Sequence, residues 1–313
     1  MHMPPALARA AAGLLFAFAA LLLPAGALAQ ARNVVIVASK IDTEGALLGH
    51  MILQVLQKAG VPVENRVQLG PTKVVRTALT AGEIDIYPEY TGNGAFFHSM
   101  ENDPAWKSAG SAFETVKRLD REKHSLVWLD RAPANNTWLI AVRGDLAKSE
   151  KLASMEDFAR LAGKAGAIKL AGSAEFVESA AALPSFEKVY GFKLPREQIV
   201  VLPGGDTAVT MRAAAQGISG VNAAMVYGTD GAIAALDLVV MDDTKGAQIV
   251  YEPAPVVRAQ VLERYPAIGP ALAKVFGSLN LTKLQSLNAQ IAVEGKPAQD
   301  VARRYLEQEG LLR

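Results

Sequence analysis

Aromatic side chains stand at positions where a binding site would need them. The block from Tyr87 to Gly94 reads YPEYTGNG and follows a short apolar run, so the sequence predicts a strand that ends abruptly in a loop presenting tyrosine rings. Electron-rich ring faces attract cations that cannot donate hydrogen bonds, and a trimethylammonium group is such a cation. The alternative is that the rings only pack in the interior. We predict an aromatic cage formed by Tyr90, Trp138, Tyr227 and Tyr251.

Residues that could carry catalysis are scarce. The chain has no cysteine, and it lacks the G-x-S-x-G, H-E-x-x-H, Walker A and G-x-G-x-x-G motifs. Of the histidines, only His98 lies beside the aromatic block, where it could contact a ligand. The pair Asp242-Asp243 has no partners at a metal-ligand spacing, so a turn is the better interpretation. We predict no catalytic residue, no metal and no cofactor.

The first 29 residues have the pattern of a secretory signal peptide. Arg9 is their only Lys or Arg, a long apolar run follows, and the small-residue exit Ala27-Leu28-Ala29 predicts cleavage after Ala29. A retained membrane anchor is the alternative. No later stretch is apolar enough to span a bilayer, so we expect no membrane insertion after cleavage.

Composition restricts the class of protein. An exported chain without disulfides must depend on a large core, and the residues after the signal suffice for two domains. Once Arg9 is removed, 31 basic residues (32 minus 1) balance 31 acidic ones. A net charge near zero gives no reason to expect nucleic acid as a partner.

Apolar runs and helical periodicity alternate along the chain in two series, which predicts helix-covered, mainly parallel sheets. Expected strands are 33–38, 63–69, 84–86, 126–129, 138–142, 167–170, 199–202, 222–227 and 238–243, and expected helices are 43–59, 71–82, 105–123, one beginning at the capping box of Ser154, 175–190, 206–216 and three near the C-terminus. The polar segment 131–137 is interpreted as a crossing between two lobes.

Two segments resemble each other. Thr72–Gly94 and Thr207–Gly231 both run from a helix through a glycine stop and a short apolar strand to a tyrosine in a polar loop. They predict two half-sites that face each other across a cleft, although chance regularity of an α/β chain is the alternative.

Several blocks together resemble a known family, the substrate-binding proteins of ABC importers for glycine betaine, choline and related osmoprotectants, of the OpuC/ProX/OsmF type. The blocks are Ser39-Lys40, Tyr87–Gly92, Asn136-Thr137-Trp138, Glu175-Phe176, Tyr190-Gly191, Thr229-Asp230-Gly231 and Tyr251–Arg258. The resemblance covers essentially the whole chain after the signal peptide. It implies a two-lobed periplasmic-binding-protein fold of type II, with the ligand in the cleft.

The resemblance also implies roles for single residues. The family's aromatic box falls on the four predicted cage residues, of which Trp138 is usually Tyr in relatives. Lys40 matches a position that helps to hold the ligand carboxylate, and Asn93 replaces a Thr that donates to it. Ser179 stands roughly where relatives have an Arg that clamps the carboxylate. The loss of this clamp should weaken the binding of a carboxylate ligand by about 1.5–3 kcal/mol. Further candidate contacts are Thr91, Asn136, Glu178, Ser179 and Thr229.

We therefore predict a periplasmic solute-binding protein that closes two lobes over a quaternary ammonium compound of the glycine betaine or choline type. Because the Arg is missing, and because Glu178 would favour a cation if it points inward, the ligand could lack a carboxylate. Lobe I is expected over 30–137 and 242–313, and lobe II over 138–241. The expected partners are an inner-membrane permease and its ATPase, and the expected state is a monomer. Alternatives are another small zwitterion, such as a histidine-derived betaine, and an exported enzyme that uses Glu89 on choline-like compounds.

Overall fold

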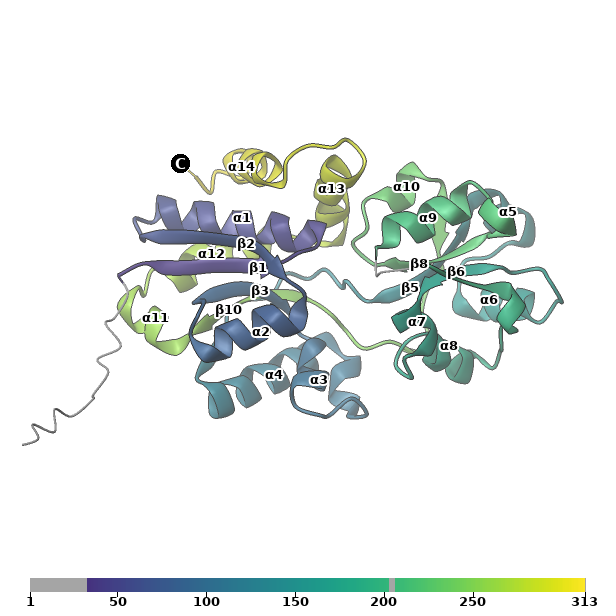
Figure 1. Cartoon of the computed structure of the whole chain (residues 1–313), viewed down its shortest axis with the longest axis horizontal. Helices are drawn as coiled ribbons and strands as arrows, with labels where there is room; N and C mark the ends of the chain where they lie inside the picture. Colours follow the sequence, from purple (N-terminus) through teal and green to yellow (C-terminus); the bar gives the residue numbers. More distant parts are fainter. Residues whose placement is uncertain (1–32, 203–205, 313) are drawn as a thin grey trace, which may run out of the picture. The chain divides into compact units, whose positions relative to one another are not determined.

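The computed structural model describes residues 33–202 and 206–312, so the predicted signal peptide lies outside the described residues. The chain forms two five-stranded sheets (Figure 1). Their strand orders are β2-β1-β3-β10-β4 and β7-β6-β8-β5-β9. The α/β fold with two sheet-containing lobes is therefore confirmed.

The first sheet is built from the two ends of the chain. Its strands are β1 (Val35–Lys40), β2 (Val63–Gly70), β3 (Ile86–Tyr90), β4 (Leu126–Trp128) and β10 (Pro253–Arg258). Strand β1 is parallel to β2 and β3, whereas β10 is antiparallel to both β3 and β4.

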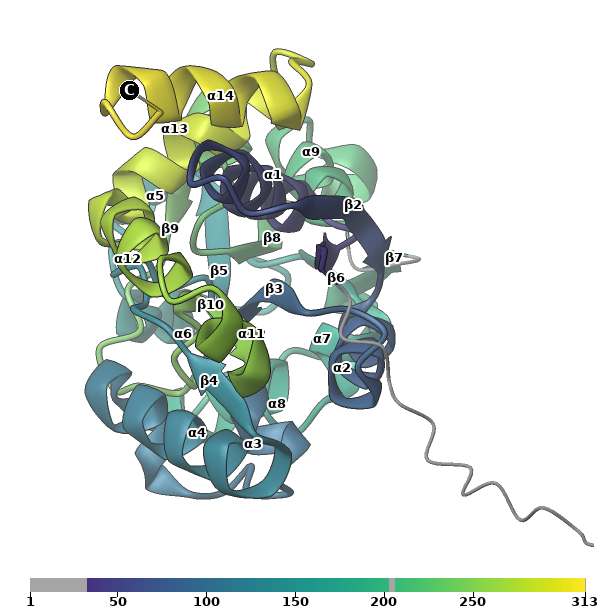
Figure 2. The same ribbon diagram turned by 90° about the vertical axis from the view of Figure 1, so that its left-hand side faces the viewer.

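Helices cover both faces of this sheet because the residues of β1 alternate between two apolar cores. Val35 and Val37 contribute to the core that contains α1 (Thr43–Lys58) and the C-terminal helices, which lie together in Figure 2. Ile36 and Ala38 contribute to the other core. The other helices of this part are α2 (Thr72–Ala81), α3 (Asn93–Phe97), the 3-10 turn η1 (Pro104–Lys107), α4 (Ala109–His124), α11 (Ala259–Arg264), α12 (Ile268–Ser278), α13 (Leu281–Ala292) and α14 (Ala298–Gln308).

The second sheet repeats this plan. Its strands are β5 (Trp138–Arg143), β6 (Leu170–Ser173), β7 (Ile199–Leu202), β8 (Ala223–Tyr227) and β9 (Leu238–Val240). Strand β6 is parallel to β7 and β8, and β5 is antiparallel to β8 and β9. The helices are α5 (Gly144–Glu150), α6 (Met155–Ala162), α7 (Ala174–Glu178), α8 (Leu183–Tyr190), α9 (Thr207–Ala215) and α10 (Ala232–Ala235), with 3-10 turns η2 (Arg196–Gln198) and η3 (Ile218–Gly220).

The sheets are mixed but mainly parallel in direction, because each has one strand that runs against both of its neighbours. These strands, β5 and β10, are the first to enter each sheet after a crossing from the other one. A strand that arrives from another sheet needs no right-handed crossover helix, so an antiparallel direction is available to it. In both sheets the strand beside it, β3 or β8, ends in tyrosine, as the similarity of the two segments predicted.

Several predicted elements differ from those of the structure: the strand predicted over 167–170 is β6, Leu170–Ser173, and the strand predicted over 238–243 ends at Val240. Strand β3 runs through Pro88 to Tyr90, because its pairing with β1 ends at Ile86 and a proline beyond that point breaks no ladder on that side. The helix predicted over 175–190 is divided into α7 and α8, since Ser179 is extended and Pro184 starts a new helix. Four helices follow β10 instead of three. The capping box at Ser154 is confirmed.

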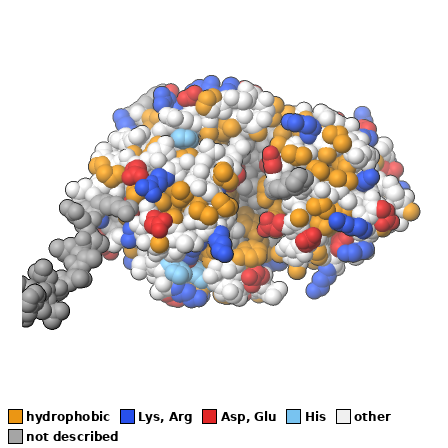
Figure 3. Space-filling view, in the orientation of Figure 1, with side chains coloured by type: hydrophobic (Ala, Val, Ile, Leu, Met, Phe, Trp, Pro, Cys, Tyr) orange, Lys and Arg blue, Asp and Glu red, His pale blue; other side chains and the backbone are white. Residues whose placement is uncertain are grey.

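The chain passes between the sheets twice, and the two crossings are hydrogen-bonded to each other. The backbone N–H of Asn136 donates to the Tyr251 carbonyl at 2.8 Å, and the Thr137 hydroxyl donates to the Ile249 carbonyl at 2.8 Å. We propose that these crossings are the hinge between lobes with the predicted boundaries. Both signs of charge are interspersed on the face shown in Figure 3. Among the described residues, no helix has the length and apolarity that a membrane span requires.

Candidate ligand-binding site

Three of the four predicted cage residues stand at the ends of strands. Tyr90 is the last residue of β3 and pairs with Pro253 at the start of β10. Trp138, the first residue of β5, pairs with Tyr227, the last of β8. Tyr251 lies in the return crossing, two residues before β10. The strand ends therefore place all four residues next to the crossings.

The second sheet supplies an aromatic cluster. The rings of Trp138 and Tyr227 are stacked with centroids 6.3 Å apart and planes 21° apart. Phe176 meets Trp138 edge-on at 6.2 Å and supports it from the core of this sheet. The stacked pair is an aromatic surface beside the hinge.

Tyr251 packs against a core of the first sheet, the one that contains Ile249 and Ala254. Its ring lies on Gly92, where a Cβ atom on any larger residue would meet the ring at 2.8 Å, so only glycine fits beneath it. Burial raises the pKa of Tyr251, and the charges of Tyr227 and Glu175 raise it further. Of the predicted cage residues, Trp138 and Tyr227 are in ring contact, while Tyr251 packs on Gly92.

Tyr90 is buried and contacts two charged groups. Its hydroxyl donates to the Glu44 carboxylate at 2.8 Å, and the Lys40 ammonium lies 4.5 Å from the centroid of its ring. Only 6% of the residue is exposed. Tyr90 is thus next to the Gly92 turn on which Tyr251 packs, while its ring already faces an internal cation.

Glu89 occupies the two donors that were predicted to hold a ligand carboxylate. The Lys40 ammonium lies 2.5 Å from Glu89 Oε1, and the Asn93 amide donates to the same oxygen at 2.7 Å. The Tyr87 hydroxyl donates to the other oxygen at 2.7 Å. Glu89 is fully buried, so these bonds offset the cost of removing its charge from water. This role of Glu89 was not predicted from the sequence, in which the only signal is an acidic residue within an apolar strand.

Glu44 joins the two parts of the site. In addition to the hydrogen bond from the Tyr90 hydroxyl, Glu44 accepts hydrogen bonds from the side-chain amide of Asn136 at 3.2 Å and from the side-chain amide of Asn288 at 2.7 Å. Asn288, on α13, also donates to the Thr229 carbonyl at 2.9 Å. Burial raises the pKa of Glu44. This buried carboxylate connects the end of β3, the hinge and the loop after β8, and it had not been singled out from the sequence.

The remaining candidates fall into two groups. The Thr91 hydroxyl donates to the Val250 carbonyl at 3.0 Å, so Thr91 fastens the return crossing, as Asn136 does. Ser179 ends α7, and its hydroxyl accepts from the Ala181 amide at 3.3 Å, while Glu178 is exposed. It is Glu175, rather than Glu178, whose charge acts on the tyrosines.

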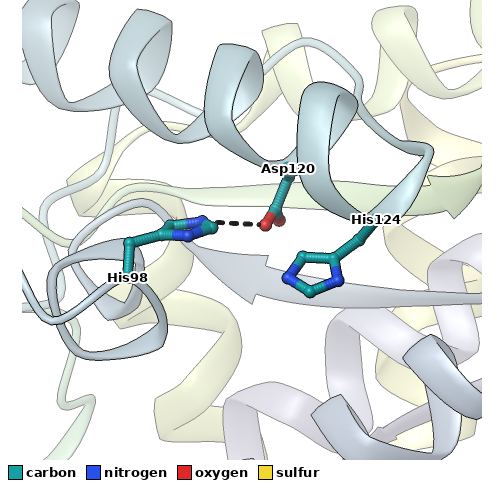
Figure 4. A group of neighbouring side chains, drawn as sticks. All are labelled: His98, Asp120 and His124. Atoms are coloured by element: carbon teal, nitrogen blue, oxygen red, sulfur yellow. Dashed lines mark hydrogen bonds and ion pairs between the residues drawn. The ribbon is translucent and has the colours of Figure 1, made fainter.

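His98 belongs to a buried ion-pair network rather than to the aromatic cluster (Figure 4). Its ring bonds Asp120 at 3.0 Å, with His124 close by, and the ligand atoms of the three residues lie within 4.8 Å of one another. However, Arg76 donates twice to Asp120, at 2.6 and 2.8 Å, and Trp128 donates at 2.7 Å. Because a guanidinium already occupies this carboxylate, the group is unsuited to a metal ion.

Asp230 gives the site a dependence on pH. Burial raises the pKa of Asp230 from 3.8 to about 7, and its carboxylate accepts from the Tyr227 amide at 2.7 Å; Glu44 and Asp206 are the charged groups that add to the shift. The folded protein therefore keeps a proton between about pH 4 and pH 7 that the unfolded chain has lost. The contribution of this proton to the free energy of unfolding is complete below about pH 4, falls as the pH rises, and is lost above about pH 7.

Asp230→Asn should remove this dependence, because asparagine keeps an acceptor for the Tyr227 amide and does not ionise. Between pH 5 and pH 8, we expect the free energy of unfolding of the wild type to fall by about 1–2 kcal/mol more than that of the variant. Urea unfolding at the two pH values measures this difference. An identical change in wild type and variant would contradict the prediction.

Comparison with known proteins agrees with this geometry. A family model described as the substrate-binding domain of the ABC-type glycine betaine transport system matches residues 33–308. The chain is 59% identical over 299 residues to the glycine betaine-binding protein YehZ of Escherichia coli K12, covering 96% of this chain and 97% of that protein. The solved structure of apo YehZ has a TM-score of 0.76 with 60% identity, over 88% of this chain and 99% of that one.

More distant relatives are also similar over most of the chain. The ergothioneine transport permease/ergothioneine binding protein EgtU of Helicobacter pylori is 28% identical over 299 residues, which span 95% of this chain but 51% of EgtU. Lactococcal OpuAC, solved in a closed form with glycine betaine, is 13% identical with a TM-score of 0.58, over 90% of this chain and 97% of that one, and shows the fold alone. The architecture is the two-lobed type II periplasmic-binding-protein fold.

Proposed function

The chain belongs to the family of substrate-binding domains of ABC-type glycine betaine transport systems, and from this premise we propose that it is a periplasmic receptor for a quaternary ammonium compound. The proposed cage consists of Tyr90, Trp138, Tyr227 and Tyr251. The receptor would deliver its ligand to an inner-membrane permease driven by a separate ATPase. YehZ is named as a binding protein and EgtU as a transport permease and binding protein, in agreement with a protein that is not an enzyme.

One observation carries the proposal: Trp138 and Tyr227 are stacked at the ends of β5 and β8, and Tyr90 and Tyr251 of the first lobe lie at the start of β10 or just before it, where the return crossing ends. Tyr251 lies in the return crossing with its ring on Gly92. The buried carboxylates of Glu44 and Glu89 lie on the side of Tyr90, where Lys40 is the basic partner. Rings with negative faces in an acidic setting favour a cation that needs no hydrogen-bond acceptor.

Motion about the hinge would complete the site. Tyr90 and Tyr251 belong to the first lobe, and Trp138 and Tyr227 to the second, so a cation held by all four rings stabilises the closed arrangement. A ligand can shift the equilibrium between open and closed forms only through contacts that differ between them. Cage contacts shared between lobes meet this condition.

A second candidate ligand is another zwitterion with a quaternary nitrogen. The name of EgtU, which is 28% identical, gives ergothioneine as its ligand, and ergothioneine is a histidine-derived betaine. The stacked pair of Trp138 and Tyr227 could hold an imidazole-derived ring as well as a trimethylammonium group.

Thermal unfolding with a panel of ligands tests the proposal. Choline, glycine betaine and ergothioneine are added separately over a series of rising concentrations; a ligand at about 100 times its dissociation constant adds about 2.7 kcal/mol to the stability of the folded state. For a protein of this size we expect at least one of them to raise the Tm by several degrees. Dimethylglycine, which lacks the quaternary charge centre, should shift the Tm less than glycine betaine.

No shift with any of these compounds would contradict the proposal. The enzyme alternative is tested separately by incubating the protein with a choline ester and following its hydrolysis. We expect no turnover, whereas stoichiometric excess of product over protein would favour an enzyme.

A further inference from the structure

Buried carboxylates are paired with basic side chains in this protein, and Glu44 is the exception. Only 5% of Glu44 is exposed, and within the described residues it takes part in no salt bridge. Because an unpaired charge is costly to remove from water, this carboxyl needs either a proton or a cation. The other buried carboxylates each have a basic partner: Asp85 with Arg258, Glu89 with Lys40, Asp120 with Arg76, Glu187 with Lys193 and Glu252 with Arg131.

The groups that bind Glu44 are neutral. They are the Tyr90 hydroxyl at 2.8 Å and the side-chain amides of Asn136 at 3.2 Å and Asn288 at 2.7 Å. These donors come from the end of β3, the hinge and α13, and Tyr90 is a residue of the proposed cage. A cation beside the Tyr90 ring would therefore lie close to a carboxyl that has no counter-charge of its own.

The charged groups around Glu44 are acidic or already paired. Asp42, the N-cap of α1, and Asp230, after β8, both interact with Glu44 through their charges. Lys40 lies over the Tyr90 ring, but it is bound to Glu89. Burial raises the pKa of Glu44 and the charge of Asp42 adds to the rise, whereas hydrogen bonds, including that from Tyr90, oppose it. The surroundings therefore favour the neutral form of this carboxyl.

Two acceptors beside Glu44 are unused. The side-chain oxygens of Asn136 and Asn288 are buried and have no donor among the residues that the structure describes. A protonated carboxyl donates as well as accepts. Half a turn of either amide would bring its oxygen to the place where its nitrogen now meets Glu44. The hydrogen-bonding groups around Glu44 can therefore accommodate one more proton.

Resting on the proposed function, we propose that Glu44 is the counter-charge for the cation of the ligand: it holds a proton in the free protein and releases this proton to solvent when a quaternary ammonium group binds beside Tyr90. The ammonium group has no proton to exchange, so the ionisation of the carboxyl is the only proton transfer. An opposite charge nearby favours the ionised form of a carboxyl. Glu44 is then a specificity-determining residue for the positive charge of the ligand.

This exchange makes the affinity depend on pH. Because a bound cation lowers the pKa of Glu44, the complex has lost the proton at pH values at which the free protein still holds it. Within this window the affinity rises with pH, and outside it the affinity is constant. If the bound cation lowers the pKa of Glu44 by about one unit, the affinity rises about tenfold across the window, and about half a proton is released per ligand at its centre.

Titration calorimetry of the wild type with choline tests the exchange. At each pH between about pH 5 and pH 9, the titration is repeated in buffers that differ in ionisation enthalpy, and the slope of the observed enthalpy gives the number of protons released. We expect a release that reaches about half a proton at its maximum, together with an affinity that rises with pH. This measurement needs no variant.

Two variants identify the source of the proton. Glu44→Gln keeps an acceptor for the Tyr90 hydroxyl and cannot ionise, so the release should disappear, and the affinity for choline above the window should fall about tenfold or more. Asp230→Asn is the matched control, because Asp230 is the other carboxyl near the loop after β8 and interacts with Glu44. This control should keep more than about half of the wild-type release.

The outcomes separate the exchange from the proposed function. If the wild type binds choline without releasing a proton at any of these pH values, the exchange is wrong while the cage remains. A release that persists in Glu44→Gln, or that is lost in Asp230→Asn alone, assigns the proton to another group and also overturns it. If the wild type binds neither choline nor glycine betaine nor ergothioneine, the proposed function fails, and the exchange fails with it.

Discussion

Trp138→Ala should lower the affinity for a quaternary ammonium ligand about a hundredfold or more. The substitution removes one face of the proposed cage and the ring on which Tyr227 stacks, at a centroid distance of 6.3 Å. Buried aromatic anchors at binding sites commonly contribute about 2–4 kcal/mol, and a desolvated cation–π contact contributes about 2 kcal/mol. Titration calorimetry with choline and glycine betaine measures the loss.

Because Trp138 is also part of the core of the second sheet, a matched control is needed. Phe158, on α6, is fully buried in the same core but has no place in the cage. Phe158→Ala should lower the stability by a similar amount, about 3–5 kcal/mol, and leave the affinity of the folded protein unchanged. Equal losses of affinity in both variants would show that Trp138 acts through folding and not through the ligand.

Asp120→Ala should destabilise the protein by about 3–5 kcal/mol, since it leaves the buried Arg76 guanidinium without its partner. Asp120 is completely buried and accepts two hydrogen bonds from Arg76, one from Trp128 and one from His98. Although burial alone would raise it, these donors, Arg76 above all, hold the pKa of Asp120 below its ordinary value. The loss is measured by urea unfolding at neutral pH.

The control for this prediction is an exposed ion pair. Asp145 is bonded to Arg143 at 2.6 Å at the surface, so Asp145→Ala should leave the unfolding midpoint unchanged within error. If Asp120→Ala cost no more than Asp145→Ala, the network in Figure 4 would have no role in stability, and another function for it would have to be sought.

Local patterns in the sequence were sufficient to predict most of the longer strands and helices, but not short helices such as α3, α5 and α10. The capping box at Ser154 and the left-handed glycine at the end of α2, Gly82 with φ 75°, depend on residues a few positions apart. The aromatic positions were predictable for a related reason, because strand ends in polar loops can be recognised from neighbouring residues. The division of the helix between Ser179 and Pro184 was missed, since the capping and packing of two short helices are decided by the core.

The partners of the charged residues could not be predicted in this way. Lys40 and Glu89 are 49 residues apart, and Glu44 and Asn288 are 244 residues apart, so nothing local indicates that they meet. Whether Lys40 faces a ligand or Glu89 depends on how β1 and β3 are aligned. The structure therefore changed the interpretation of the polar end of the site more than that of its rings.

The most direct test of the central claim compares each ligand with an uncharged carbon isostere of its trimethylammonium group. Choline is paired with 3,3-dimethyl-1-butanol, and glycine betaine with 3,3-dimethylbutanoate, so that shape is kept and the positive charge is removed. We predict that in at least one pair the ammonium compound binds the wild-type protein tighter by about tenfold or more. Equal affinity within both pairs, or no binding by either ammonium compound, would contradict the proposal that these rings recognise a quaternary cation.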